Sequence, residues 1–439
     1  MAALDPQIAE LVEQTPFVDT HEHLIEESVR VSGALHDRWL PCDDWAYLFS
    51  NYVADDLLVA GMPAVDLQKF LGQTLSSEAK FGLVAPYWDR IRHTGYAQAL
   101  RYTFRGLYGE EDLTADSLQR IAAKYHETVR PDFYATILQK ANIEFCHVNS
   151  VQRIFMETAQ PALLAQDLNI RDFTRCSPAD LARVKAETGK EPRTLEEWLE
   201  IIDFYFATFG PRAVAVKCDI AYARSLNFRP VAKTQAARLF LHHVGTRAGY
   251  EDLKALQDFL FRYCVGKAQE WGLPVKLHTG YIAGNGMLQP ARVRDNAADL
   301  SCLLQDFPDT LFVLMHIGYP YQEEFIALAK HYRNTAIDMC WAWIINPGAS
   351  VRFLRDFLLA VPADKIFTFG GDYSAVEPIY GHARIARRGI TQALSELVAE
   401  GWLAREEAPE LIERIMRGNA LRLFPNRHGT TAPVSTRMA

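Results

Sequence analysis

The chain has 439 residues, 49% hydrophobic and 23% charged, so it can bury one large core or two smaller ones. Its net charge of −8 argues against nucleic-acid and anionic-membrane partners, because no basic excess is present to neutralise phosphates. The seven cysteines form no CxxC pair and no apolar run approaches the ~20 residues of a membrane helix, so we expect a cytoplasmic protein without a disulfide framework.

The first predicted strand, residues 17–23, is the apolar run FVDTHEH, which ends in two histidines that flank a glutamate. Side chains at positions i and i+2 of a strand point to the same face, so His21 and His23 would look into the same space. That spacing is the geometry of a shared metal ion. The alternative, a pair of surface imidazoles, fits less well at the end of a buried strand.

A long segment of helical character, residues 24–141, follows this first strand. Thr114 is the expected N-cap of one of its helices, which would open with TADSLQRIAAKYHETV. Because the segment leaves the C-terminal end of a strand, we expect it to form a helical cap over the strand ends. A second helical insertion is expected at roughly 221–265.

Seven more short apolar runs follow, and longer helical patterns separate them. Continuously apolar strands with helices between them indicate a parallel sheet covered by helices, and eight such units predict an α/β fold of the (β/α)8 TIM-barrel type. The barrel would comprise residues 1–23 and 142–425, and residues 426–439 would be a C-terminal tail. The eight predicted strands are 17–23, 143–149, 162–168, 213–219, 273–279, 311–317, 335–341 and 366–373.

Several of the later strands also end in a polar or ionisable residue. The C-terminal strand ends of a (β/α)8 barrel form the mouth of the active site, so these side chains would converge there. The residues concerned are His147, Lys217, His278, His316 and Asp372.

This set of strand ends resembles the amidohydrolase superfamily of metal-dependent barrels. The segments LHTGYIAGNG, HIGYPY and FGGDYSAVE are most similar to its amidohydrolase 2 branch of hydrolases and nonoxidative decarboxylases, and the helical insertion after HxH is similar to that of uronate isomerases. The resemblance implies that His21, His23, His278 and Asp372 are metal ligands or lie beside the metal. It also implies that His316 binds a second metal or polarises the substrate, and that Lys217 is carboxylated and bridges two metals.

Each of these residues also has a simpler structural interpretation. Asp372 as an ionised carboxylate beside a metal-bound water would act as general base, but an aspartate after two glycines also suits the cap of the following helix. His278 and His316 would otherwise be hydrogen-bonded core histidines. A buried lysine is costly unless it is paired or modified, and Lys217 would otherwise form a salt bridge to Asp219, Glu22 or another carboxylate.

The predicted cofactor is one or two divalent ions, with Zn²⁺ first and Mn²⁺ or Fe²⁺ as alternatives. The predicted reaction is hydrolysis of an amide, ester or lactone bond of a small molecule by metal-activated water, with Asp372 as the base and His316 as the stabiliser of the oxyanion. The alternatives are nonoxidative decarboxylation of a small carboxylic acid and a uronate-isomerase-like rearrangement of a sugar acid. The sequence leaves open whether the chain forms a homo-oligomer.

The insertion also offers a weaker prediction. Its arginines, interleaved with aromatic residues, would bind a substrate carboxylate, or else line a solvated helix face, which is the more ordinary role. Trp341 and Trp343, at the end of the seventh predicted strand, would stack on a ring or simply close the barrel. The arginines are Arg92, Arg101 and Arg105.

Overall fold

The computed structural model describes residues 4–34, 40–245 and 250–425. It divides into two compact units, and each is described by itself. Unit 1 comprises residues 1–146, 282–288 and 338–420, and unit 2 comprises residues 147–281, 289–337 and 421–439. The predicted tail, residues 426–439, lies outside the described residues, and the predicted boundaries of barrel and insertion stay a prediction.

The strands of unit 1 gather around β1, whose residues are all buried. Phe17 N–H donates to the carbonyl of Asn142 at 3.0 Å, just before β2, and Thr20 N–H donates to the carbonyl of Phe369 at 3.1 Å, just after β9. Met339 N–H then donates to the carbonyl of Phe367 at 2.9 Å, so residues 338–341 extend the series. The bounds are β1 (Phe17–Glu22), β2 (Ile143–Val148), of which residues 143–146 belong to this unit, and β9 (Ile366–Phe367).

Unit 2 contains a series of buried strands in the order β4-β5-β6-β7-β8, in which β4 to β7 pair in parallel. The register pairs Asn169 with Lys217, Lys217 with Lys276 and Lys276 with Val313, so these four positions lie in one row across the strands. The bounds are β3 (Leu164–Gln166), β4 (Leu168–Asn169), β5 (Val216–Cys218), β6 (Val275–Leu277), β7 (Phe312–Met315) and β8 (Thr335–Asp338), of which residues 335–337 belong to this unit.

All eight predicted strands contain a strand of the structure, and the run 162–168 contains one strand and the beginning of another, β3 and β4. Helices separate most of them, so the predicted α/β alternation is confirmed. The apolar runs predicted these strands because strands buried on both faces need continuous apolar sequence. The closure of the strands into one barrel concerns both units and stays a prediction at this point.

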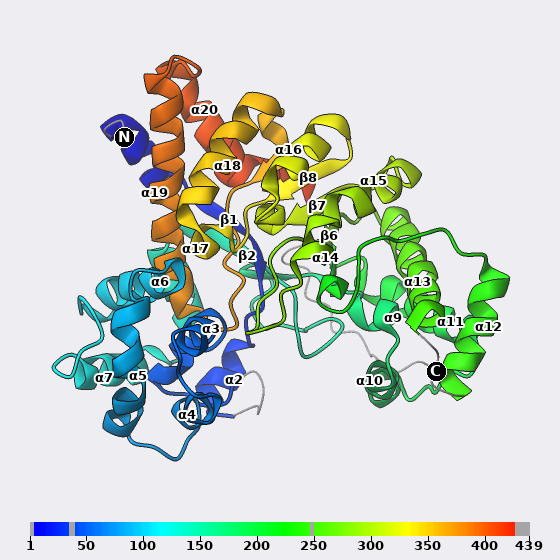
Figure 1. The fold of residues 1–439 in the computed structure, drawn as a ribbon, viewed down its shortest axis with the longest axis horizontal. Helices are drawn as coiled ribbons and strands as arrows, with labels where there is room; N and C mark the ends of the chain where they lie inside the picture. The colour runs from blue at the N-terminus through cyan, green and yellow to red at the C-terminus, as the bar shows by residue number, and fades with distance from the viewer. Residues whose placement is uncertain (1–3, 35–39, 246–249, 426–439) are drawn as a thin grey trace. The chain divides into compact units, whose positions relative to one another are not determined.

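The described residues of the predicted insertion lie in unit 1, and their helical character is confirmed; these helices gather in blue and cyan in Figure 1. Its placement as a cap stays a prediction. The bounds are α1 (Pro6–Gln14), α2 (Glu27–Ser32), α3 (Tyr52–Val59), α4 (Ala64–Phe70), α5 (Ser77–Ile91), α6 (Gly95–Thr103), α7 (Leu118–Thr128), α8 (Phe133–Lys140), α17 (Ala342–Ile345), α18 (Pro347–Ala360), α19 (Glu377–Ala399) and α20 (Ala408–Glu413), with α21 (Asn419–Leu423) shared between the units.

Two helices of unit 2 begin with strong caps. Ser177 with Asp180 and Thr194 with Glu197 form reciprocal capping boxes at the starts of α10 and α11, which fixes where these helices begin. The second predicted insertion is confirmed as helical by α12 and α13. The bounds are α9 (Arg171–Arg175), α10 (Pro178–Thr188), α11 (Leu195–Phe209), α12 (Lys233–Gly245), α13 (Tyr250–Glu270), α14 (Pro290–Arg294), α15 (Asn296–Asp306) and α16 (Gln322–His331).

The predicted N-cap Thr114 is wrong by one turn. Helix α7 begins at Leu118, and its N-cap is Ser117. Thr114 and Ser117 instead satisfy each other, because each hydroxyl oxygen accepts the backbone N–H of the other residue, at 2.9 and 3.1 Å. The pair therefore closes a separate turn before the helix.

Helix α19 packs closely on two neighbours in unit 1. A Cβ at Gly381 would meet the carbonyl of Ala99 on α6, and a Cβ at Gly389 would meet the ring of Trp343 on α17. The two glycines allow this close approach of α19, which begins at Glu377, five residues after Asp372. Among the described residues, no helix combines the length and the apolar character needed to cross a membrane.

Candidate metal centre

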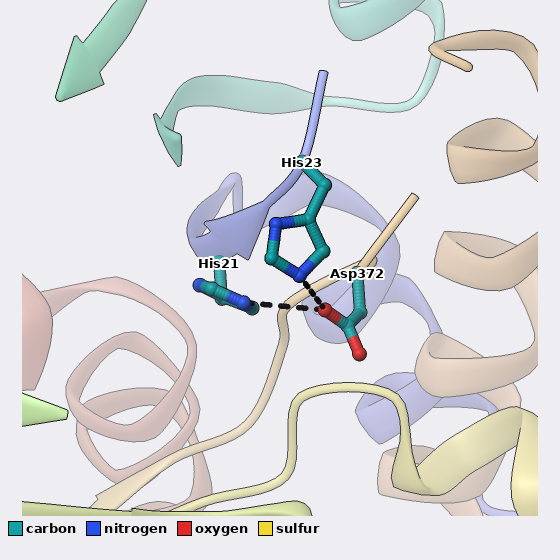
Figure 2. Close-up of side chains that lie close together, drawn as sticks. All are labelled: His21, His23 and Asp372. Carbon is teal, nitrogen blue, oxygen red and sulfur yellow. Dashed lines mark ion pairs between the residues drawn. The ribbon is translucent and has the colours of Figure 1, made fainter. Parts of the chain in front are cut away.

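Two histidines and one aspartate meet at the end of β1 in unit 1. His21 Nε2 and His23 Nε2 each lie 3.2 Å from the same carboxylate oxygen, Oδ1 of Asp372 (Figure 2). The side chains of His21 and Asp372 are buried and that of His23 is 20% exposed. The structure therefore brings together three of the predicted metal ligands.

The backbone explains why residues 350 positions apart in the sequence meet here. Asp372 N–H donates to the carbonyl of His21, and His23 N–H donates to the carbonyl of Tyr373, both at 2.9 Å. This ladder continues the pairing of β1 beyond β9. The i, i+2 spacing then places both imidazoles on the side from which Asp372 approaches.

Asp372 has a backbone conformation that favours glycine, with φ of 66°. Aspartate tolerates this left-handed region better than most residues, at a cost of about 1 to 3 kcal/mol when the surroundings enforce it. The preceding glycines have a steric reason, because a Cβ at Gly370 would meet the side chain of Cys340 and one at Gly371 would meet the carboxylate of Glu22. The segment before Asp372 is thus closely packed on both sides.

The two imidazoles control the charge of Asp372. Burial alone would raise the pKa of this carboxyl, but the hydrogen bonds from His21 and His23 outweigh burial and hold its pKa well below the usual range. Asp372 is therefore ionised at neutral pH, as a metal ligand or a proton acceptor must be.

The cluster fits a divalent ion. Two imidazoles and a carboxylate are a donor set that Zn²⁺, Mn²⁺ and Fe²⁺ accept. Ligand bonds of about 2.0 Å in tetrahedral geometry place neighbouring ligand atoms about 3.3 Å apart. The observed 3.2 Å from each imidazole to Asp372 matches that separation.

Behind the cluster lies a pair of buried carboxyl groups, Asp19 and Glu22. Burial raises the pKa of Asp19 to about 6. Burial and the charge of Asp19 raise the pKa of Glu22 well above its usual range. One proton held between the two groups relieves the repulsion of two buried negative charges. Neither residue was predicted as part of the site, although two acids within one buried strand were a visible signal.

Aromatic rings of the insertion stack beside the cluster. The ring of Tyr52, at the start of α3, stacks on Trp341 at 4.8 Å and on Tyr96 at 5.1 Å. The hydroxyl of Tyr52 donates to the carbonyl of Asp372 at 2.5 Å. Trp341 is fully buried, and the rings on which it stacks are those of Tyr52 and Tyr96. No sequence motif marked Tyr52.

Two other predicted site residues, His278 and His316, meet in unit 2. Nε2 of His316 lies 3.0 Å from Nδ1 of His278, and Nε2 of His278 lies 2.9 Å from the carbonyl of Tyr281. A carbonyl only accepts, so in a neutral ring His278 carries its proton on Nε2 and accepts the N–H of His316. Strand β7 ends at Met315, so His316 follows the strand, with φ of 64°. The ligand and catalytic roles of these histidines stay predictions.

Lys217 lies on β5 and is buried, as predicted for a strand-end lysine. Its register partner on β6 is Lys276, which is fully buried and bonds both oxygens of Asp167 at 3.0 and 2.9 Å. Asp219, one of the partners expected for Lys217, pairs with Arg171 at 3.2 Å. Carboxylation of Lys217 stays a prediction.

The arginines of the insertion pair with acids within eleven positions in the sequence. Exposed side chains favour the solvated-face interpretation for Arg92 and Arg105, whereas the side chain of Arg101 is only 19% exposed. Their guanidinium groups lie 3.5, 3.0 and 2.7 Å from carboxylates. The pairs are Arg92 with Asp89, Arg101 with Asp112 and Arg105 with Glu111.

Comparison with known families and sequences gives two matches. An amidohydrolase family model matches residues 202–425. Protein fluG of Emericella nidulans is 26% identical over 231 residues, which are 50% of this chain and 26% of that protein. The chain thus spans about a quarter of the length of this relative.

Comparison with solved structures extends over almost the whole chain. A uronate isomerase from Thermotoga maritima is 13% identical with a TM-score of 0.73, covering 95% of this chain and 96% of that one. A glucuronate isomerase from Caulobacter crescentus is 17% identical with a TM-score of 0.75, covering 97% and 95%. At these identities the likeness shows the fold, and the α/β fold predicted from the sequence matches that of these enzymes.

Proposed function

Because the chain belongs to the amidohydrolase 2 family of the amidohydrolase superfamily, we propose that it is a metal-dependent isomerase that interconverts the aldose and ketose forms of a sugar acid. The observation that carries this reaction is the likeness to two uronate isomerases over 95% and 97% of the chain, helical insertion included. The substrate is then a small carboxylated polyol.

The proposed ligands are His21, His23 and Asp372, which hold one divalent ion. Zn²⁺ is the first proposal, with Mn²⁺ and Fe²⁺ as alternatives, because imidazole and carboxylate donors suit all three. A bound ion at this position supplies a Lewis acid that polarises the carbonyl and hydroxyl oxygens of the sugar.

Asp372 is the proposed proton carrier of the reaction. Aldose–ketose isomerisation moves a proton between adjacent carbons, which requires a group that accepts it from one carbon and returns it to the other. Both imidazoles contact Oδ1 of Asp372, so Oδ2 is the oxygen proposed to exchange the proton. The hydrogen bond from Tyr52 to the Asp372 carbonyl keeps the carboxylate in place during the transfer.

The test is a screen of hexuronates with protein loaded with Zn²⁺, Mn²⁺ or Fe²⁺, followed by NMR and mass spectrometry. Isomerisation gives ketose signals while the molecular mass of the sugar stays the same. The matched control is the double variant His21→Ala/His23→Ala, which should show no conversion. Absence of conversion by metal-loaded parent protein across the set of hexuronates would contradict the proposed reaction.

Hydrolysis of an amide, ester or lactone is the second candidate, and the family match supports it. In that reaction Asp372 would take a proton from the attacking water and deliver it to the leaving group. The product distinguishes the candidates, because hydrolysis adds one water to the substrate, decarboxylation releases carbon dioxide and isomerisation does neither.

A further inference from the structure

Glu22 stands between the two histidines in the sequence, but its carboxylate serves a different segment. The side chain is fully buried. Its Oε2 accepts the backbone N–H of Tyr373 at 2.7 Å, one residue after Asp372. Its Oε1 lies against Gly371, one residue before Asp372, so closely that a Cβ there would collide with it.

Asp19 supports the same segment from the same strand. Its Oδ1 accepts the backbone N–H of His21 at 3.1 Å and that of Gly371 at 3.4 Å. The two acids thus contact both neighbours of Asp372 and the backbone of one histidine. Among these contacts, Glu22 alone reaches both sides of Asp372.

We propose that Glu22 is a positioning residue that holds the segment 371–373 so that Oδ1 of Asp372 stays 3.2 Å from both His21 and His23. The metal affinity of the cluster then depends on a side chain that contributes no ligand atom. The inference rests on the proposed metal site and adds a residue to it.

The physical reason is the backbone of Asp372. A left-handed φ of 66° is sparsely populated without enforcement, so the segment would relax if its neighbours were released. Relaxation would move Oδ1 away from the imidazoles, and partners that orient metal ligands are each worth about 10- to 100-fold in metal affinity.

Glycine at position 371 provides the means for a compensation test. The backbone of Gly371 does not require glycine, since its φ is outside the left-handed region, so the carboxylate of Glu22 is what excludes a side chain there. Gly371→Ala should therefore displace the segment in the parent protein. In a Glu22→Ala background the added methyl has space, so the two effects should not add.

The experiment uses the full chain and five variants. They are Glu22→Gln, Glu22→Ala, Gly371→Ala, the double Glu22→Ala/Gly371→Ala, and Glu27→Ala as matched control. Glu27 is also buried, on α2, but its carboxylate accepts the N–H of Tyr134 at 2.8 Å, away from the segment. Two quantities are measured: the dissociation constant for Zn²⁺ alone, by chelator competition, and urea unfolding of the metal-free protein.

Glu22→Ala is expected to weaken Zn²⁺ binding by about tenfold or more, and Gly371→Ala to weaken it as well. Glu22→Gln should stay within about threefold of the parent, because an amide oxygen can still accept the Tyr373 N–H. Glu27→Ala should bind Zn²⁺ like the parent. The double variant should bind more tightly than the product of the two single effects predicts, and its unfolding free energy should show the same favourable coupling.

The proposal is overturned if folded Glu22→Ala binds Zn²⁺ within threefold of the parent, or if the effects of Glu22→Ala and Gly371→Ala simply add. Should Glu22→Ala fail to fold, Gly371→Ala decides: parent-like Zn²⁺ affinity in that variant overturns the proposal and weakened affinity supports it. Failure of the parent to bind Zn²⁺ would instead contradict the proposed metal site, while the coupling in metal-free protein would still decide whether Glu22 holds the segment.

Discussion

The hydroxyl of Tyr52 donates a hydrogen bond to the backbone carbonyl of Asp372, although 320 positions separate them in the sequence. Tyr52 lies on α3 of the helical insertion, and Asp372 lies after β9. The insertion therefore reaches a proposed metal ligand directly within unit 1. Its tyrosine fixes a carbonyl that belongs to a residue with a left-handed backbone.

Tyr52→Phe should lower the unfolding free energy by about 1 to 2 kcal/mol, because it leaves a buried carbonyl without its donor while the ring stack with Trp341 remains. Turnover should fall in the same variant if the carbonyl positions Asp372. Urea unfolding and activity assays measure the two effects. Tyr102→Phe, a half-buried tyrosine of the same insertion, is the control; equal stability of both variants would contradict the role given to the hydroxyl.

The sequence predicted the strands well because buried parallel strands leave a continuous apolar signal. It also predicted the meeting of His21, His23 and Asp372, because strand ends converge whatever the distance along the chain. The contact of Tyr52 could not be predicted, since it depends on how the insertion folds back, and no spacing rule encodes that. The role of Glu22 could not be predicted from its place between the two histidines, because its Oε2 accepts a backbone N–H that lies 351 positions away.

His21→Ala/His23→Ala should abolish binding of a divalent ion at the cluster, because Asp372 alone offers one of three ligand groups. Elemental analysis of purified parent and variant measures the metal content, with thermal unfolding as the check on folding. His93→Ala/His126→Ala, two histidines of the insertion outside the cluster, is the control. Full metal content in the folded His21/His23 variant would show that the ion binds elsewhere.

Asp372→Asn should keep the fold and lower turnover by about 10²-fold or more, since asparagine keeps the shape but cannot accept a proton. Zn²⁺ affinity should also fall, because a charged ligand oxygen is replaced by a neutral one. Activity on the identified substrate, measured at saturating metal, separates the two effects. Near-normal turnover in this variant would remove Asp372 from the proton transfer while leaving the metal site intact.

Arg30→Met should destabilise unit 1 by about 3 kcal/mol or more. The Arg30 side chain is fully buried and its guanidinium bonds Glu377, the first residue of α19, at 2.9 Å, so its loss leaves a buried carboxylate unpaired. Arg120→Met is the control, because Arg120 is 60% exposed in its pair with Glu110 and such pairs contribute under about 1 kcal/mol. Urea unfolding compares them; similar losses would refute the assignment of a structural role to the buried pair.

The burial of His382 makes the free energy of unfolding depend on pH, and it also sets the sign of that dependence. The ring is fully buried on α19, and burial lowers its pKa to about 3 from an ordinary 6.5. Between these values the unfolded chain binds a proton that the folded chain does not, so His382 makes stability fall as pH drops below 6.5.

Between pH 7 and pH 5, His382 lowers the free energy of unfolding by about 2 kcal/mol. His382→Gln cannot take up the proton, so its unfolding free energy should depend less steeply on pH by that amount, whatever its absolute stability. Urea unfolding at pH 7, 6 and 5 measures the slopes, with His126→Gln, which replaces an exposed histidine on α7, as the control. Parallel slopes for the parent and His382→Gln would show that the buried ring takes up its proton as readily in the folded chain as in the unfolded one.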